Sequence, residues 1–486
     1  MEAGYRQSRV AFRLHAGLVE PGAWPMSKVI TLTLTGEQRD HLKAHLFPGD
    51  GKEAAALILC GQHDGASRHR LLAREIHPVP YAVCERREDF ISWPVEWMDD
   101  LVDRAAAKHL SIVKVHSHPG DYARFSPADD VSDSRLFPGI HALVEGVAVH
   151  ASVVMMPTGA LFGRSVDAYG TFEPLERISV VGDDIEIYFA DPPRTASDTI
   201  GRATSAFGRQ MTAEMARLTA ALAGASGTGS IINEAFGRLG FGKIITVDPQ
   251  NAERKNLNRI VNATAQDAAR ETPKVEIASR AVQAMGLGTE TVPIPEDLVS
   301  RKSVLAIAEA DVLVGGVDSA EGRDVMSRIC AAYMIPYIDM GVRIHALPDG
   351  TVDAIEVVVH YLKPGGSSLL SREAYTVEQV AADALRRQNP ALYAERVREK
   401  YIKGADEEMP AVISVNMTVA AMAANELLAR LYRTRNQPNA AYAITRINLA
   451  ENEIESVAEG APCPVMAKLV GRGDAGPLLG LPELSL

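Results

Sequence analysis

Residues 224–230 read Gly224-Ala-Ser226-Gly227-Thr-Gly229-Ser230 and lead into an apolar helical run, Ile231–Leu239. A glycine-rich turn that opens a helix presents backbone N–H groups and the positive end of the helix dipole to a phosphate group. The next segment, Lys243–Asp248, has the pattern of a short strand with an acid at its end, where a ribose-binding carboxylate is expected. We therefore expect a nucleotide site that includes Gly224, Gly227, Gly229 and Asp248.

Downstream of this turn, short apolar strands alternate with helical stretches. The strands are Ile244–Asp248, Val312–Asp318 and Tyr337–Met340. This alternation is typical of a mainly parallel sheet with helices on both faces, so an α/β, Rossmann-like fold is expected from about residue 196 onward. An irregular stretch, Lys363–Ser371, interrupts the pattern and is expected to be a surface crossover loop.

Four further polar residues distinguish between two kinds of nucleotide. Asn256 and Arg259 follow Asp248 in the string Asn-Leu-Asn-Arg, Lys274 comes next, and Asp318 ends a later strand. Two cations and amide groups around a ribose-binding acid suit a triphosphate. A nicotinamide dinucleotide does not need them, which disfavours an NAD-dependent oxidoreductase.

These segments resemble the ThiF/ubiquitin-activating adenylyltransferase family in order and spacing over about residues 200–345. The resemblance implies that Asp248 holds the ribose of ATP, that Asn256, Arg259 and Lys274 hold the phosphates, and that Asp318 manages Mg²⁺ near the α-phosphate. It also implies a homodimer in which Arg202 reaches into the other subunit's site. The chain departs from the family at Ser226, Ile260 and Gln250, where a glycine, a glutamine and an acid are usual.

A second motif lies in the first half of the chain. An apolar, β-branched run, Ile112–Val115, precedes His116-Ser-His118-Pro119. Residues two apart on a strand share a face, so both imidazoles can reach one ion. Ser126-Pro-Ala-Asp129 then has the pattern of a helix start, which would return Asp129 towards the histidines, and the spacing favours Asp129 over Asp130. Two histidines and a carboxylate leave one zinc position open to water, as in catalytic zinc sites.

The string His-x-His-Pro-x6-Ser-x2-Asp resembles the JAB/MPN metallopeptidases, also called JAMM proteases, over about residues 28–165. The resemblance implies an α+β domain with zinc on His116, His118 and Asp129. It further implies that Glu53, which precedes an apolar strand ending in glycine, activates the zinc water. By the same likeness, Ser126 would donate a hydrogen bond to the oxyanion.

The chain is expected to divide into three regions. Residues 1–26 would be an extension without structure, 27–195 the JAB/MPN domain and 196–486 the adenylating domain, with a linker at about 190–197 that contains paired prolines. The formal net charge of -12 does not favour nucleic acid or an anionic membrane as a partner, and no apolar run approaches the roughly 20 residues of a membrane span. Cysteines without a CxxC pair favour reduced thiols and a cytoplasmic protein.

Together the two motifs predict a bifunctional enzyme. One domain would adenylate the C-terminal carboxylate of a ubiquitin-like protein, using ATP and Mg²⁺, and the other would hydrolyse peptide or isopeptide bonds at such tails with zinc. This architecture resembles bacterial ubiquitin-like conjugation modules, several of which serve antiviral defence, and implies a conjugating enzyme as a further partner. The alternatives are activation of a sulfur-carrier protein in cofactor or cysteine biosynthesis, and a scaffold with two inactive sites.

The cysteines bear on the step that comes after adenylation. No cysteine lies between Cys330 and Cys463, and the Lys363–Ser371 stretch has serines where relatives often carry a Cys-x-x-Cys pair. Cys330 is expected to be a core thiol, and Cys463 is the one candidate that looks exposed. We therefore expect no obligatory thioester on this chain.

Overall fold

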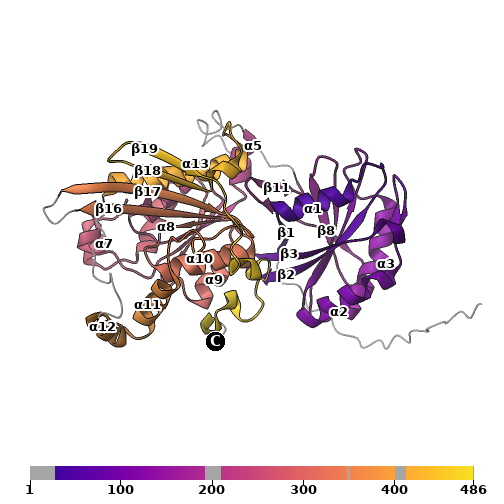
Figure 1. Ribbon diagram of the computed structural model, residues 1–486, viewed down its shortest axis with the longest axis horizontal. Coiled ribbons are helices and arrows are strands. Elements are labelled where there is room, and N and C mark those ends of the chain that lie inside the picture. The colour runs from indigo at the N-terminus through magenta and orange to yellow at the C-terminus, as the bar shows by residue number, and fades with distance from the viewer. Residues whose placement is uncertain (1–27, 192–208, 347–350, 400–411, 485–486) are drawn as a thin grey trace, which may run out of the picture.

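The computed structural model describes residues 28–191, 209–346, 351–399 and 412–484. Figure 1 shows two domains side by side, the first in indigo and magenta and the second in pink, orange and yellow. The expected extension over residues 1–26, most of the expected linker and Arg202 lie outside the described residues. Within the described ranges, no helix is both long and apolar enough to cross a membrane.

The first domain is built on one mixed sheet. Its strands are β1 Val29–Thr35, β2 Ala55–Asp64, β3 Arg68–Pro78, β6 Ser111–Ser117, β7 His150–Met155, β8 Leu161–Val166, β9 Phe172–Pro174, β10 Arg177–Val181 and β11 Ile185–Phe189. They lie in the order β11-β10-β1-β3-β2-β6-β7-β8-β9. β1 is parallel to β3 and β10, and β6 is parallel to β7, whereas the other neighbours are antiparallel. A separate hairpin consists of β4 Glu85–Arg86 and β5 Ile91–Ser92.

Three α-helices accompany this sheet in the described part of the first domain. They are α1 Gly36–Leu46, α2 Asp99–Lys108 and α3 Pro127–Leu143. α3 begins where the sequence predicts, with Ser126 as the N-cap and Pro127 at the first helical position. Ser126 and Asp129 form a reciprocal capping box, so local sequence fixes the point at which this helix starts.

The second domain contains an eight-stranded sheet. Its strands are β12 Thr219–Ala223, β13 Lys243–Val247, β14 Glu290–Ile294, β15 Val312–Gly315, β16 Tyr337–Ala346, β17 Val352–Leu362, β18 Ile444–Asn448 and β19 Glu453–Val457. The order is β14-β13-β12-β15-β16-β17-β18-β19, and the sheet is parallel from β14 to β16 and antiparallel from β16 to β19. The mainly parallel sheet is therefore confirmed. β15 ends at Gly315, so Asp318 lies in the following loop and not on the strand.

Helices cover both faces of this sheet (Figure 1). The α-helices in the described part of this domain are α5 Arg209–Met215, α6 Gly227–Leu239, α7 Ala265–Ala269, α8 Lys274–Ala284, α9 Arg301–Ile307, α10 Ala320–Tyr333, α11 Val377–Gln388, α12 Pro390–Arg398 and α13 Ile413–Tyr432, of which α11 and α12 lie away from the sheet. Successive residues of β12 point to opposite faces. Ala220 and Leu222 belong to a core cluster with α6 and α13, whereas Ala221 and Ala223 belong to one with α9 and α10.

The two domains share buried polar contacts as well as apolar ones. Asp311, just before β15, forms ion pairs with Arg68 at 2.7 Å and with Arg177 at 3.0 Å, and none of these side chains is more than 8% exposed. Burial by itself would raise the pKa of Asp311, but the two guanidinium groups hold that pKa below its usual value. Removing one partner of such a buried ion pair strongly destabilises a protein. These three residues therefore help to fix the contact between the two domains.

Two sequence-based expectations need correction. The Lys363–Ser371 stretch is irregular but not on the surface, since Ser367 and Ser368 are only 5% and 3% exposed. The C-terminal part of the chain covers it, and Cys463 N donates a hydrogen bond to Gly366 O at 3.0 Å. Cys463 is itself 1% exposed, because it packs with Ala331, Met466 and Leu469. The expectation of an exposed Cys463 was therefore wrong, whereas Cys330 lies in the core as expected.

Candidate functional site

The end of β6 carries two histidines into one small space. The β-branched residues before them are buried in the sheet, and His116 and His118 are 1% and 5% exposed. Their Nε2 atoms face each other at 3.2 Å. This arrangement follows from the two-residue period of a strand, which turns both rings to the same side.

Asp129 reaches the same space from the first turn of α3. Its Oδ1 lies 3.0 Å from His116 Nε2, and its Oδ2 lies 3.4 Å from His118 Nε2. The Ser126 hydroxyl donates a hydrogen bond to Asp129 Oδ2 at 2.8 Å, so the residue expected at the oxyanion acts here on the carboxylate. Asp130 pairs with Arg164 instead, at 2.5 Å.

The three side chains fit a metal ion. The ligand atoms of His116, His118 and Asp129 all lie within 4.8 Å of one another, and no other such group occurs among the described residues. His118 Nδ1 faces Tyr122 O at 2.8 Å, a contact that orients the ring as in metal sites. Burial by itself would raise the pKa of Asp129, but hydrogen bonds from both histidines hold it well below its usual value. An ionised carboxylate between two imidazoles is a donor set that suits zinc.

Glu53 lies beside this group, just before β2. It is 5% exposed, and its Oε1 is 4.0 Å from His118 Nε2. Burial raises the pKa of Glu53 to about 7, and the effects of His118 and Asp129 oppose each other. A carboxyl group that titrates near neutrality suits proton transfer. A cavity of about 400 Å³ opens next to Glu53, between α3 and the β4–β5 hairpin, and Phe90 and Trp93 contribute apolar walls.

A buried cluster of charges holds α3 behind Asp129. Asp133, one helical turn further on, is 0% exposed and pairs with Lys114 of β6 and, at 2.7 Å, with Arg164 of β8. α3 carries Asp129, and β6 carries His116. The ion pairs of this cluster therefore hold α3 and β6, which provide two of the three candidate ligands, in a fixed position relative to each other. We did not expect this cluster from the sequence. The available signal was an acid four residues after Asp129, on the same side of the helix.

The glycine-rich turn joins β12 to α6 in the second domain. Gly224 has a φ of +92°, which L side chains rarely adopt. A Cβ at Gly229 would lie 1.8 Å from Gly224 O, and a Cβ at Gly227 would lie 2.3 Å from the side chain of Asn416. Ser226 makes no side-chain cap, so the first N–H groups of α6 are available to an anion.

Asp248 and Lys274 lie next to this turn. The Asp248 oxygens accept hydrogen bonds from Ala225 N at 2.7 Å and from Gln250 N at 2.8 Å. Lys274 Nζ donates to Gln250 Oε1 at 2.5 Å. Gln250, one of the positions at which the chain departs from the expected pattern, thus accepts a hydrogen bond from the lysine. Burial lowers the pKa of Lys274, while Asp248 opposes that shift.

The three other residues expected to bind the nucleotide, Asn256, Arg259 and Asp318, have different surroundings. Asn256 is 3% exposed, and its Oδ1 accepts a hydrogen bond from Glu253 N at 3.0 Å, so it shapes its own loop. Arg259 passes along the glycine turn, with its Cδ 3.5 Å from the Cβ position of Gly227. Asp318 is exposed. Both side chains act on the pKa of Lys274, which Arg259 lowers and Asp318 raises.

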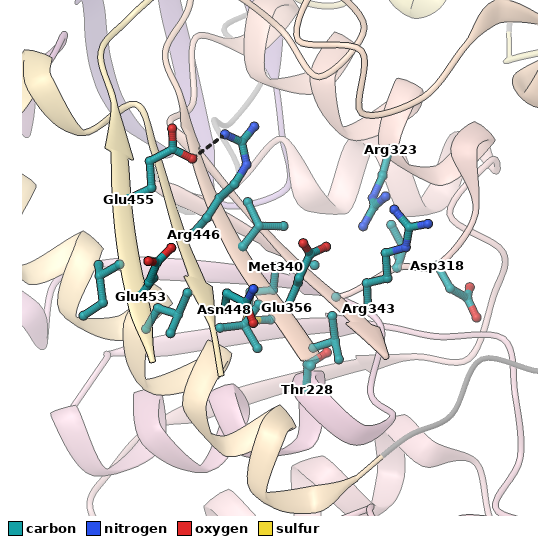
Figure 2. Close-up of a pocket in the computed structure, with 18 residues that line it drawn as sticks. Thr228, Asp318, Arg323, Met340, Arg343, Glu356, Arg446, Asn448, Glu453 and Glu455 are labelled. Carbon is teal, nitrogen blue, oxygen red and sulfur yellow. Dashed lines mark hydrogen bonds and ion pairs between the residues drawn. The ribbon is translucent and has the colours of Figure 1, made fainter. Parts of the chain in front are cut away.

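A groove of about 760 Å³ extends from this site over the antiparallel strands (Figure 2). Thr228 and Asp318 line its nucleotide end, and Figure 2 shows Arg323 of α10 and Arg343 of β16 beside Asp318. Arg323 Nε lies 3.5 Å from Asp339, a carboxylate that is 1% exposed. Neither arginine was expected from the sequence, although Arg323 follows Asp318 within the short string Asp-Ser-Ala-Glu-Gly-Arg.

The glycine turn, the acid after β13 and the helices on both faces define the second domain as a Rossmann-like α/β domain. The ThiF family model matches residues 201–465, more than half of the chain, so this protein belongs to the ThiF family. The model of prokaryotic homologs of the JAB domain matches residues 36–165. The chain is therefore a fusion of a JAB-type domain with a ThiF-type adenylyltransferase domain.

Several solved structures are similar to part of this chain. The crystal structure of E. coli MccB with ATP is 16% identical, with 55% of this chain and 73% of that chain covered and a TM-score of 0.42. E. coli MccB with MccA-N7isoASN is 17% identical, with 55% and 74% covered and a TM-score of 0.43. The PaaA structure is 13% identical, with 54% and 82% covered and a TM-score of 0.39. No curated protein sequence matches the chain.

Proposed function

We propose that this protein adenylates the C-terminal carboxylate of a ubiquitin-like protein with ATP and cleaves peptide or isopeptide bonds at such tails. The observation that carries the proposal is the meeting of Asp248, Arg259, Lys274 and Asp318, from separate segments, beside one glycine turn. The groove next to them gives a peptide tail access to the same point.

In the adenylating domain the protein would act mainly by positioning and charge neutralisation. Asp248 would hold the ribose, and Arg259 and Lys274 would hold the phosphates, with the N–H groups at the start of α6. Arg323 and Arg343, at the nucleotide end of the groove, would hold the tail carboxylate for attack on the α-phosphate. Pyrophosphate leaves, and the tail becomes an acyl-adenylate.

In the JAB-type domain, His116, His118 and Asp129 would hold zinc, which when bound acts as a Lewis acid on water and on the scissile carbonyl. Glu53 would take up and return the proton, since a pKa of about 7 allows both near neutral pH. Ser126 would donate a hydrogen bond to the oxyanion, which requires its hydroxyl to turn away from Asp129.

The two proposed reactions concern the same chemical group. Hydrolysis after a tail glycine exposes the carboxylate that adenylation consumes, so one chain would mature a tail, activate it and later release it from targets. A conjugating enzyme would receive the activated tail, and a homodimer would bring Arg202 to the other subunit's site.

The test is ATP–pyrophosphate exchange by the purified protein with C-terminal tails of candidate ubiquitin-like proteins. Arg259→Ala and Asp318→Ala should each lower exchange by about 100-fold or more. The exposed Arg270 provides a matched control, and Arg270→Ala should leave exchange unchanged. Glu53→Gln should keep exchange and lose cleavage. Loss of exchange in a folded Glu53→Gln protein would contradict two separate sites.

A further inference from the structure

Arg164 of β8 lies beside α3, close to the candidate metal site. Strand register places Arg164 opposite Ser152 of β7, and Ser152 opposite Lys114 of β6. Residues opposite each other in neighbouring strands point to the same face of a sheet, and Lys114 shares its face with His116, two residues further along β6. Arg164 therefore lies on the side of the sheet that carries the histidines, and its side chain is only 9% exposed.

The Arg164 guanidinium contacts residues on both sides of the Ser126–Asp129 segment. Its Cζ lies 3.8 Å from the ring centroid of Phe125, which directly precedes this segment. Its Nη1 pairs at 2.5 Å with Oδ1 of Asp130, which directly follows the segment. Its Nη2 and Nε both donate to Asp133 Oδ2, at 2.7 and 3.2 Å. One planar cation thus holds the start of α3 at three points.

Hydrogen bonds inside the segment hold its shape but do not connect it to the sheet. Ser126 N and Oγ both donate to Asp129 Oδ2, at 2.7 and 2.8 Å. The contacts that join the flanking residues to the sheet come from β8. They are those of Arg164 and that of Phe162, whose ring centroid lies 5.4 Å from that of Phe125. The position of Asp129 relative to the histidines therefore depends on Arg164.

The contacts of Arg164 need an arginine and not merely a positive charge. A guanidinium presents its donors in a fixed fork and stacks both faces on aromatic rings. Arg164 uses both properties, since Phe172 of β9 covers its second face at 3.7 Å from the ring centroid. A lysine would keep the charge but could not hold two carboxylates and a ring in one geometry. Asp133 would also keep Lys114 as a partner, so the buried carboxylate would stay paired.

We propose that Arg164 is a positioning residue of the metal site, which holds Asp129 at the place where it shares a metal ion with His116 and His118. The proposal rests on the zinc site of the proposed function and gives Arg164 no contact with metal or substrate. Residues that orient metal ligands change metal affinity by about 10-fold to 100-fold when they are replaced. Loss of the Arg164 fork should therefore weaken zinc binding in a protein that is still folded.

The test measures the zinc affinity of the metal-free full chain by competition with a chromophoric chelator, and the visible spectrum of the same protein loaded with Co²⁺. Arg164→Lys should raise the Kd for zinc by about 10-fold to 100-fold and change the Co²⁺ spectrum, because Asp129 is displaced. Arg68→Lys is the matched control. Arg68 is an equally buried arginine of the same domain, but its carboxylate partner is Asp311 of the second domain, so zinc affinity and spectrum should stay as in wild type.

Two ring variants give a second test, which remains decisive if Arg164→Lys does not fold. Phe125 and Phe172 cover opposite faces of the same guanidinium, but only Phe125 adjoins the segment that carries the ligand. Phe125→Leu should weaken zinc binding about tenfold, and Phe172→Leu by no more than about twofold. Wild-type affinity in Arg164→Lys and Phe125→Leu, or equal losses in the two ring variants, would overturn the inference alone. Wild-type protein that binds no zinc would overturn the metal site and the proposed hydrolysis with it.

Discussion

His63 Nδ1 lies 3.0 Å from Asp474 Oδ1, although 411 positions separate the two residues in the chain. Asp474 also accepts hydrogen bonds from the Tyr333 hydroxyl at 2.9 Å and from Asp64 N at 3.1 Å. Tyr333 ends α10 of the second domain, whereas His63 and Asp64 end β2 of the first. One carboxylate near the C-terminus therefore fastens the two domains to each other.

The backbone beside Asp474 is inserted between the same two elements. Gly473 forms a bridge with Gln62 of β2, and its N–H donates to Ala332 O of α10 at 2.9 Å. A Cβ at Gly473 would lie 2.0 Å from Gln62 O, so only glycine fits. The last part of the chain thus belongs to the interface as much as to the second domain.

We predict that Asp474→Ala lowers stability by roughly 1–3 kcal/mol, because His63 and Tyr333 lose their acceptor in a buried contact. The thermal unfolding midpoint should fall, and limited proteolysis should cut between the domains more readily. Asp103→Ala is the control, since Asp103 is exposed on α2. Equal midpoints for Asp474→Ala and Asp103→Ala would contradict a fastening role.

For the metal site, we predict about one zinc per chain in the purified protein, measured by mass spectrometry of the metal content. His116→Ala and His118→Ala should lose the metal, because each removes one of three ligands. Glu53→Gln should keep it and lower hydrolysis by about 100-fold to 10000-fold, because only proton transfer is removed. Wild-type protein without zinc would refute the site.

The parts of both sites that the sequence predicts lie in short segments with fixed local geometry. His116 and His118 share a strand face, and Asp129 follows a helix start that Ser126 and a proline define. The parallel half of the second sheet was predictable for a similar reason, because strands and helices alternate there. In each case the signal is hydrophobic periodicity or helix capping within a single helix or strand.

The features that could not be predicted depend on contacts between distant segments. Arg323 becomes a groove residue only because α10 packs beside β16, and no local pattern shows this. The long segment that holds α11–α13 separates β17 from β18, so sequence order does not reveal that these two strands pair. Cys463 between two prolines looks like an exposed loop residue, yet tertiary packing buries it.

A buried histidine should make stability depend on pH. His150 is 0% exposed and its Nδ1 accepts a hydrogen bond from Ile112 N at 2.9 Å. Burial, and secondarily His141, lower the pKa of His150 to about 3. Between that value and about 6.5 the unfolded chain binds a proton that the folded protein does not, so stability falls as the pH is lowered, by up to about 1.4 kcal/mol per pH unit.

We therefore predict that His150→Asn, which can keep an acceptor for Ile112 N, reduces the acid sensitivity of unfolding. Denaturant titrations between pH 6.5 and 4 should show a slope smaller than that of wild type by up to about 1.4 kcal/mol per pH unit. His41→Asn, at an exposed position of α1, serves as the control. Identical slopes for wild type and His150→Asn would show that this histidine is not the source of the dependence.

The last prediction concerns the step after adenylation. A thioester needs an accessible thiolate. Burial raises the pKa of the thiols of Cys60, Cys84 and Cys330, and Cys463 is 1% exposed in its apolar cluster. Incubation of the protein with ATP and its cognate tail should therefore give no thiol-sensitive adduct on a non-reducing gel, in wild type as in Cys463→Ala and the control Cys84→Ala. The adenylate would then pass directly to a nucleophile on another protein. A thiol-sensitive adduct that disappears only in Cys463→Ala would make Cys463 catalytic and would require the C-terminal part of the chain to open during the reaction.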